Sequence, residues 1–411
     1  MRKYLVYCTV FAATSIIALA AFNWFADPFW IFGSPEIRRF NAAKPSVDSH
    51  QRIFKITNAL RERPQVLITG TSREDSGIDP KHPAFTGRTV FNASTSAQPF
   101  VESKELLRAL ADEGSEPSLI VFGLLFENAN VYGSPLPPDY SADNFSDHHF
   151  GLVFNLDTVE ASIMTVVDNL VRNQKAFDER KDGFRTPNSW TDQLSIGQRR
   201  AFRNSERNYL LDYHFPQPAC KNSLVSDRDG RDRIAPMEEL REAIAIAYRF
   251  KTDMRLFIGP SHARQWETIG ASGLWSQFED WKRMLLQIVE SEAEKAHASP
   301  FPVWDFSGYN TITVEEVPSV QDTNARMQYY YESSHYAPAA GDLVLDRIFN
   351  LPITGRAVPS DFGVRLTRQN IEAHLANIRV ARERYRRMHP DDVAEIESMS
   401  REVAKQKHCP N

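Results

Sequence analysis

Short apolar runs alternating with helical stretches are the feature of this chain that most restricts its fold. The apolar runs occupy residues 66–69, 89–92, 118–122, 254–258 and 302–306. Apolar residues at helical spacing lie between or before them, at residues 51–60, 102–111, 236–250 and 274–289. Strands that are apolar on both faces belong to parallel sheets that helices cover on both sides. The sequence therefore predicts an α/β protein with a parallel sheet.

The middle of the chain interrupts this alternation. "YGSPLPPDYSADNFSDHH" is typical of a loop, "LDTVEASIMTVVDNLV" has the pattern of an amphipathic helix, and "SLVSDRDGRDR" is highly charged. We interpret it as an insertion that caps the carboxyl edge of the sheet. A helix is expected to begin near Pro338, a suitable first-turn residue. A long charged helix or helix pair is expected after residue 366.

The N-terminus predicts export. Arg2 and Lys3 precede an uncharged run that is long enough to cross a bilayer as a helix, and aromatic residues follow it. This pattern predicts a single-pass anchor in the inner (cytoplasmic) membrane, with the rest of the chain in the periplasm or outside the cell. A cleaved signal peptide is the alternative, because Ala18-Leu19-Ala20 fits a cleavage site. Cys220 and Cys409 can pair in an oxidising compartment or stay free.

These features divide the chain into six segments. They are an anchor or signal peptide (1–32), a connection (33–63), a first part of the α/β domain (64–129), an insertion (130–235), a second part of the α/β domain (236–355) and a helical tail (356–411).

Several classes of function lack support in the sequence. The net charge of −5 leaves no basic footprint for nucleic acid. The chain has no Walker loop, no GxGxxG and no CxxC pair. Asp147, His148 and His149, with Asp143 nearby, are metal-capable, but in a Pro- and Ser-rich loop we interpret them as a solvated cluster. No metal and no cofactor is therefore expected.

Two polar motifs fall where parallel strands present their carboxyl ends. Gly70-Thr71-Ser72-Arg73 follows the run at 66–69, and Glu332-Ser333-Ser334-His335 precedes the helix near Pro338. A serine hydroxyl needs an adjacent base to become a nucleophile, and that base needs a group that fixes its tautomer. A turn can bring the Glu332 carboxylate against one imidazole nitrogen and leave the other for Ser72. An ordinary turn leaving the sheet is the structural alternative.

These two motifs resemble those of the SGNH (GDSL-like) hydrolases, most closely the membrane-anchored branch of alginate O-acetyltransferase-like and D-alanyl transfer-like proteins. The resemblance covers residues 64 to about 350. It implies a flavodoxin-like three-layer sheet and acyl transfer or ester hydrolysis through an acyl-serine. It makes Ser72 the nucleophile, His335 the base and Glu332 the orienting acid. It also implies a polysaccharide or glycan acceptor and a membrane acyl-carrier partner.

The chain departs from the family pattern at three positions. The family's acid is usually Asp, so Asp305 in "PVWDF" is an alternative to Glu332. The family's second sequence motif offers a glycine to the oxyanion hole, and this chain has Asn92 there. The family's third motif, Gly-x-Asn-Asp, is not matched, and Asn128 is carried as an oxyanion donor. The backbone N–H of Ser72 is the remaining donor.

Three further residues are candidate substrate-binding groups. Arg73 either contacts an acidic sugar or forms a structural ion pair, and His262 either lines the site or is an ordinary loop histidine. Tyr336 belongs to a tyrosine-rich stretch suited to sugar stacking or to aromatic packing. Two functions follow from the sequence. One is an exported serine O-acyltransferase or esterase, and the other is an inactive protein of the same fold that assembles or binds carbohydrate in the envelope.

Overall fold

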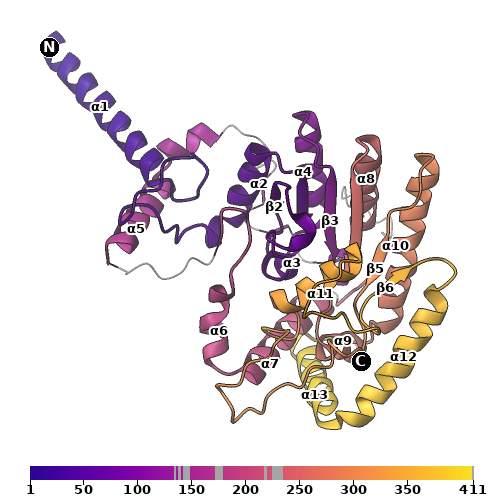
Figure 1. The fold of residues 1–411 in the computed structure, drawn as a ribbon. Coiled ribbons are helices and arrows are strands. Elements are labelled where there is room, and N and C mark those ends of the chain that lie inside the picture. Colours follow the sequence, from indigo (N-terminus) through magenta and orange to yellow (C-terminus); the bar gives the residue numbers. More distant parts are fainter. Residues whose placement is uncertain are drawn as a thin grey trace.

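A six-stranded sheet forms the centre of the molecule (Figure 1). The computed structural model describes residues 1–133, 136–137, 140–141, 149–171, 179–216, 220–224 and 235–409. The strand order is β2-β1-β3-β4-β5-β6, with β1 to β5 parallel and β6 antiparallel to β5. The strands are β1 (Val66–Thr69), β2 (Val90–Asn92), β3 (Leu119–Leu124), β4 (Asp253–Ile258), β5 (Val303–Asp305) and β6 (Val364–Leu366). The predicted α/β class is confirmed, and the sheet is mixed rather than wholly parallel.

Helices cover both faces of the sheet because the central strands are apolar on both sides. Leu67, Ile120 and Met254 point into one core, beneath four helices that include α4, α8 and α10 standing side by side (Figure 1). Val66, Val121 and Phe257 point into the second core, beneath α11, and α3 packs against α11 and β1. The bounds on the first face are α2 (Gln51–Glu62), α4 (Phe100–Asp112), α8 (Pro236–Arg249) and α10 (Trp275–Lys295), and on the second α3 (Ser72–Gly77) and α11 (Pro338–Phe349).

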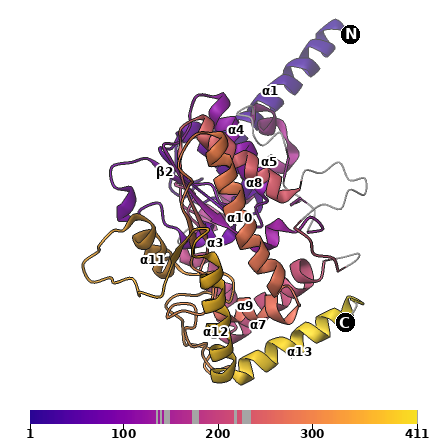
Figure 2. The ribbon, with the colours of Figure 1, turned by 90° about the vertical axis from the view of Figure 1, so that its right-hand side faces the viewer.

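The C-terminal segment differs in part from the expected tail of helices. It begins with β6, which extends the sheet beside β5, before α12 (Ile371–Met388) and α13 (Pro390–Gln406) form the helix pair. Figure 2 shows α12 and α13 meeting at a sharp angle. Ile371 and Leu375 of α12 join the first core, so this segment is packed onto the α/β domain.

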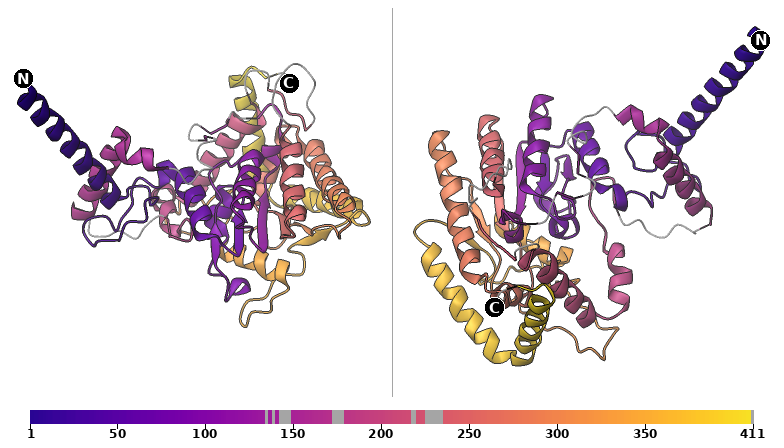
Figure 3. Two further views of the ribbon diagram at one scale, coloured as in Figure 1. Left: turned by 90° about the horizontal axis from the view of Figure 1, so that it is seen from above. Right: turned by 180° about the vertical axis from the view of Figure 1, so that it is seen from behind.

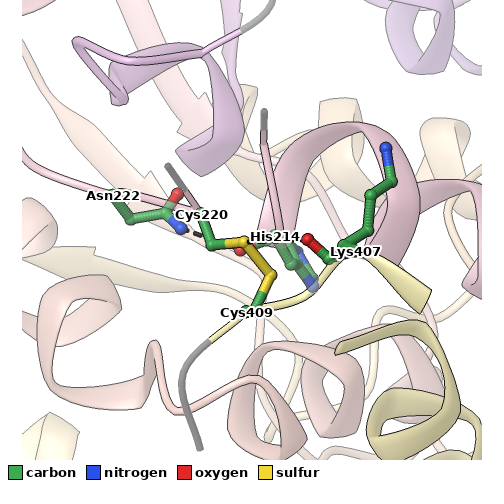
Figure 4. The surroundings of a disulfide bond; sticks show 5 residues. All are labelled: His214, Cys220, Asn222, Lys407 and Cys409. Carbon is green, nitrogen blue, oxygen red and sulfur yellow. Dashed lines mark hydrogen bonds between the residues drawn. A yellow bond between two sulfur atoms is a disulfide. The ribbon is translucent and has the colours of Figure 1, made fainter. Parts of the chain in front are cut away.

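A 3-10 turn, η3 (Phe126–Ala129), follows β3. The insertion then supplies further helical elements, which in order are η5 (His149–Phe154), α5 (Leu156–Val171), η6 (Pro187–Trp190), α6 (Thr191–Ser195), α7 (Gln198–Tyr209) and η7 (Leu210–His214). Helix α7 contacts α13 and α9 (Ala263–Ala271). A disulfide between Cys220 and Cys409, with Cα atoms 5.7 Å apart, joins the insertion to the residues after α13 (Figure 4). The pairing that the sequence left open is thus present.

The N-terminal helix α1 (Arg2–Ala26) stands away from the α/β body in every view (Figure 3). It is long and apolar enough to cross a membrane, and none of its most apolar stretch is buried in the protein. A signal sequence near an N-terminus has the same features. Short 3-10 turns at η1 (Asp48–His50) and η2 (Pro83–Phe85) complete the elements.

Candidate active site

Ser72 is the first residue of α3, directly beyond the carboxyl end of β1. The chain passes from β1 to β2 on one side and then crosses to β3 on the other side of β1. In open α/β sheets, ligands bind at such a reversal, outside the carboxyl ends of the strands. The fold therefore places the Ser72 hydroxyl where a ligand site is expected.

A capping box fixes the turn that carries Ser72. The Thr71 side chain accepts a hydrogen bond from the backbone of α3, and the Glu74 carboxylate accepts one from the Thr71 N–H at 2.8 Å. That carboxylate fills the space above two strand ends, because a Cβ added at Gly70 or Gly123 would lie 2.5 or 2.1 Å from Glu74 atoms. Burial raises the pKa of the Glu74 carboxyl. The spacing Thr71-x-x-Glu74 was a sequence signal for this cap.

His335 lies next to Ser72. Its loop is closed by a backbone bridge between Tyr330 and Tyr336 just before α11. The Ser72 Oγ is 2.7 Å from the His335 Nε2, and the His335 Nδ1 is hydrogen-bonded to the Glu332 carboxylate. A donor proton on Nδ1 leaves the Nε2 lone pair facing the hydroxyl. The arrangement allows the imidazole to take a proton from Ser72.

The Glu332 carboxylate is buried but well satisfied. It accepts hydrogen bonds from the backbone N–H groups of Ser334 and His335, each at 2.9 Å. Burial alone would raise the pKa of Glu332, but the charge and hydrogen bond of His335, a Ser205 hydrogen bond and the Ser334 N–H outweigh it and lower that pKa. Glu332 is therefore an anion at neutral pH, suited to orient the imidazole and to stabilise its protonated form.

The three residues open into a pocket of about 360 Å³. The insertion supplies much of its wall, from η6, α7 and η7. The Trp190 ring lies 4.7 Å from the His335 ring and stacks on Tyr331 at 4.8 Å. The turn η7 is π-helical, a geometry that often marks functional sites. The lining residues are Ser72, Ser96, Ala97, Arg185, Ser189, Trp190, Gln193, Ser205, Asn208, Tyr209, Asp212, Tyr213, Glu332 and His335.

The two expected oxyanion asparagines do not face the pocket. The Asn92 amide donates to the backbone carbonyls of Glu74 and Ile78 at 2.8 and 3.0 Å, so it ties β2 to α3. The Asn128 amide donates to the Gln98 carbonyl at 2.6 Å. Both amide groups serve the backbone, and neither residue lines the pocket. The prediction of side-chain oxyanion donors at these positions is therefore wrong.

Arg73 is a buried structural residue. Its guanidinium donates to the Ser334 hydroxyl at 3.0 Å and to the Tyr209 hydroxyl at 3.3 Å, and it lies over the Tyr209 ring. It thereby ties the turn of Ser72 to the loop of His335 and to α7. Arg73 was predicted to make either a substrate contact or a structural ion pair. It makes neither, because the groups that its guanidinium contacts are hydroxyls.

His262 and Tyr336 also lie away from the pocket. The His262 Nδ1 caps α9 by accepting from the Arg264 N–H at 3.1 Å, and its Nε2 donates to the Glu315 carbonyl at 2.7 Å. The Tyr336 ring is buried, with its hydroxyl donating to Glu74 at 3.1 Å. Both are packing residues, which corrects their assignment as substrate-binding groups.

Asp305 does not compete with Glu332 for the histidine. Its carboxylate accepts hydrogen bonds from Lys282 at 2.7 Å and from His374 at 2.9 Å, in β5, three strands away from β1. The metal-capable residues Asp143, Asp147 and His148 lie outside the described residues, as does the side chain of His149. Among the described residues, no group of three or more His, Cys, Asp or Glu side chains could hold a metal ion.

The pocket wall was not foreseen from the sequence. Trp190, Tyr209 and Tyr213 carry no motif, and they reach the site only because the insertion folds over the sheet. Comparisons with protein-family models, curated proteins and solved structures found no match to this chain.

Proposed function

We propose that this chain is an exported serine acyl-transfer enzyme, an O-acetyltransferase or esterase, that acts on a cell-envelope or secreted polysaccharide. One observation carries the proposal, namely the hydrogen-bonded series from Ser72 to His335 to Glu332 at the wall of a pocket. A surface serine in a plain turn needs neither partner, whereas a nucleophile needs both.

The proposed reaction has two halves. As the Ser72 Oγ attacks the acyl carbonyl carbon, its proton passes to the His335 Nε2, and Glu332 stabilises the imidazolium. The tetrahedral intermediate collapses, and the leaving alcohol takes that proton as its bond to the acyl carbon breaks. A sugar hydroxyl or water then gives its proton to His335 and attacks the acyl-serine. Collapse of the second intermediate returns the proton to Ser72.

The developing oxyanion requires hydrogen-bond donors in the pocket. With Asn92 and Asn128 occupied elsewhere, we assign this role to the backbone N–H of Ser72. It belongs to the first turn of α3, where N–H groups have no partner within the helix.

The pocket lining favours a hydroxyl-rich substrate. Hydroxyl and amide groups of Ser189, Gln193 and Asn208 share the wall with the rings of Trp190 and Tyr213. Aromatic faces stack on the apolar faces of sugar rings while polar groups bind hydroxyls, so this mixture suits a glycan. A membrane acyl carrier is the proposed source of the acyl group.

Three further features support an exported protein related to the SGNH hydrolases. The order β2-β1-β3-β4-β5 of the parallel strands is that of flavodoxin-like sheets. The Cys220–Cys409 disulfide suits an oxidising compartment such as the periplasm. Helix α1 fits a single-pass anchor in the inner membrane.

A second function is an inactive envelope protein that binds carbohydrate or assists assembly. The commitment of the Asn92 and Asn128 amides to backbone carbonyls favours it, because the expected side-chain oxyanion donors are then missing from the pocket. The aromatic wall of the pocket suits glycan binding without catalysis.

A genetic comparison separates the two functions. A strain carrying Ser72→Ala at normal protein level should lose O-acylation of its polysaccharide as completely as a deletion strain. Unchanged O-acylation in the Ser72→Ala strain, together with its loss in the deletion strain, would favour the binding function and contradict catalysis.

A further inference from the structure

Helix α5 packs a polar face against the protein and turns an apolar face outward. The side chains that it buries include Thr158, Ser162, Thr165 and Asn169. Most of its large apolar side chains are exposed, together with Asp157 and Glu160 near its beginning. In a water-soluble helix the apolar face turns inward and the polar face outward. The surroundings of the outer face of α5 must therefore differ from water.

The exposed apolar side chains form one stripe. Positions 156, 163, 167 and 170 recur at helical spacing, with 164 and 171 beside them. Glu160 interrupts the stripe near the beginning of α5, so the continuous part covers residues 163–171. The exposed fractions are Leu156 76%, Ile163 50%, Met164 57%, Val167 49%, Leu170 65% and Val171 77%.

Polar contacts hold α5 in this orientation. The Asn169 side chain exchanges hydrogen bonds with the backbone of Ala43, at 2.8 Å as acceptor and 2.9 Å as donor. Ala161 packs against Phe29 and Ile31 in the segment that follows α1. Since these contacts use the polar and small face, α5 cannot turn its apolar stripe inward without breaking them.

The stripe belongs to a helix that packs against α1. Helix α5 and the turn η5 both pack against α1, and the Asn23 amide in its last turn donates to the Val153 carbonyl at 2.9 Å. The 25 residues of α1 span roughly 37 Å at 1.5 Å per residue, against a hydrocarbon core of about 30 Å. The end of α1 that contacts η5 therefore lies at a membrane surface when α1 crosses the bilayer.

We propose that the apolar face of α5 lies in the membrane–water interface, with the stripe at residues 163–171 among the lipid acyl chains. The proposal rests on the membrane anchoring proposed above for α1. Lipid is the favoured occupant, because α5 packs against α1, and α1 is the helix proposed to cross the bilayer. An interfacial helix of this kind buries its apolar side in the acyl-chain boundary.

This second attachment holds the α/β domain in one orientation over the bilayer. A single helix would let the domain turn about the end of α1. Much of the pocket wall follows α5 in the chain, from Arg185 to Tyr213. The pocket is thus presented to substrate at a constant height above the lipid.

The test places a fluorescent probe on α5 of the full chain. In a Cys8→Ala background, Val167→Cys and Ile163→Cys are labelled with nitrobenzoxadiazole and reconstituted into phosphatidylethanolamine–phosphatidylglycerol vesicles. The matched control is Val380→Cys, at a position that is also an exposed valine (70% exposed) on α12, away from α1 (Figure 1). Nitroxide on lipid acyl chains and aqueous iodide serve as the two quenchers.

The proposal predicts that lipid nitroxide quenches the probes at 163 and 167 and that iodide quenching is lost there, while the probe at 380 shows the reverse. Iodide quenching at 163 and 167 equal to that at 380 would place α5 in water and overturn the proposal. Protection from both quenchers would overturn it too, because a protein partner or second copy would then cover the stripe.

Flotation and serine labelling on the same samples separate the possible failures. A protein that does not float with the vesicles contradicts both the membrane anchoring of α1 and the insertion of α5 into the interface. A protein that floats but has α5 in water contradicts the insertion of α5 alone. Loss of fluorophosphonate labelling at Ser72 with α5 in lipid contradicts only the enzymatic proposal.

Discussion

The hydroxyl oxygen of Ser72 lies 2.7 Å from the Nε2 of His335, although 263 positions separate the two residues along the chain. The turn after β1 carries one of them and the loop before α11 carries the other. The buried Arg73, which contacts the Ser334 hydroxyl, joins the two segments directly. The nucleophile and its general base thus come from two segments that are far apart in the sequence and that the fold brings into contact.

The first prediction concerns the third member of this series. Glu332→Gln should lower ester hydrolysis by about 10³- to 10⁴-fold, because a neutral amide holds the imidazole in the wrong tautomer and cannot stabilise its charge. Release of p-nitrophenol from p-nitrophenyl acetate by the detergent-solubilised full chain measures the rate. Asp305→Asn is the matched control, since Asp305 contacts Lys282 and His374 instead. An equal loss of rate per folded molecule in both variants would contradict the assignment of Glu332.

A second prediction concerns the close approach of the Glu74 carboxylate to β3. Gly123→Ala should destabilise the protein by about 1–3 kcal/mol, because the new methyl group would overlap Glu74, which Thr71 and Tyr336 hold in place. Fluorophosphonate labelling of Ser72 should slow as its turn shifts. Gly151→Ala, at a glycine with open space around it, should change stability by less than about 0.5 kcal/mol. Equal stability of the two variants in urea denaturation would show that Glu74 does not need this space.

A third prediction concerns acid stability. Burial lowers the pKa of His262 to about 3, from 6.5 in the unfolded chain. Because the unfolded chain takes up the proton first, the contribution of His262 is complete above pH 6.5 and declines as the pH falls toward 3. Between pH 7 and 4.5 the wild type should lose roughly 2–3 kcal/mol through this residue.

His262→Asn is the comparison for the acid-stability prediction, since asparagine keeps an acceptor at the N-cap of α9. The difference in unfolding free energy between the wild type and this variant should narrow on acidification. A difference that stays constant from pH 7 to 4.5 would show that His262 does not remain neutral in the folded protein.

A fourth prediction concerns the disulfide, which closes a loop of 189 residues. Replacing Cys220 and Cys409 by serine should lower the free energy of unfolding by about 2–5 kcal/mol, because the unfolded chain gains conformational freedom. Urea denaturation should give the same shift for the wild type under reducing conditions. Cys8→Ser, at the exposed free cysteine of α1, serves as the control and should not shift the midpoint. An unchanged midpoint for the double variant would show that the bond does not stabilise the fold.

Much of the fold could be predicted because buried strands and amphipathic helices leave strong local patterns. The strand at Val66–Thr69 and the helix that begins at Pro338 were both expected where they lie. β6 was missed because three residues with an exposed Arg365 carry no strand pattern. α3 was missed because its six residues have no apolar periodicity, although its capping box was visible.

The site could be predicted only in part. Residue types and strand ends pointed to Ser72, His335 and Glu332, whose side chains the fold brings together. Asn92 was misassigned because the sequence does not show which carbonyl groups lie within reach of its amide. In the fold these are the carbonyls of Glu74 and Ile78, in and just after α3. Trp190 reaches the pocket through the path of the insertion over the sheet, which no short motif encodes.

Covalent trapping of Ser72 is the most direct measurement of the central claim. The detergent-solubilised full chain is treated with a fluorophosphonate, digested and analysed by mass spectrometry. The account predicts one phosphonate on the Ser72 peptide of the wild type, with labelling abolished in Ser72→Ala and strongly slowed in His335→Asn. Wild-type protein that is folded but unlabelled at Ser72, or labelled equally in His335→Asn, would contradict a base-activated serine nucleophile.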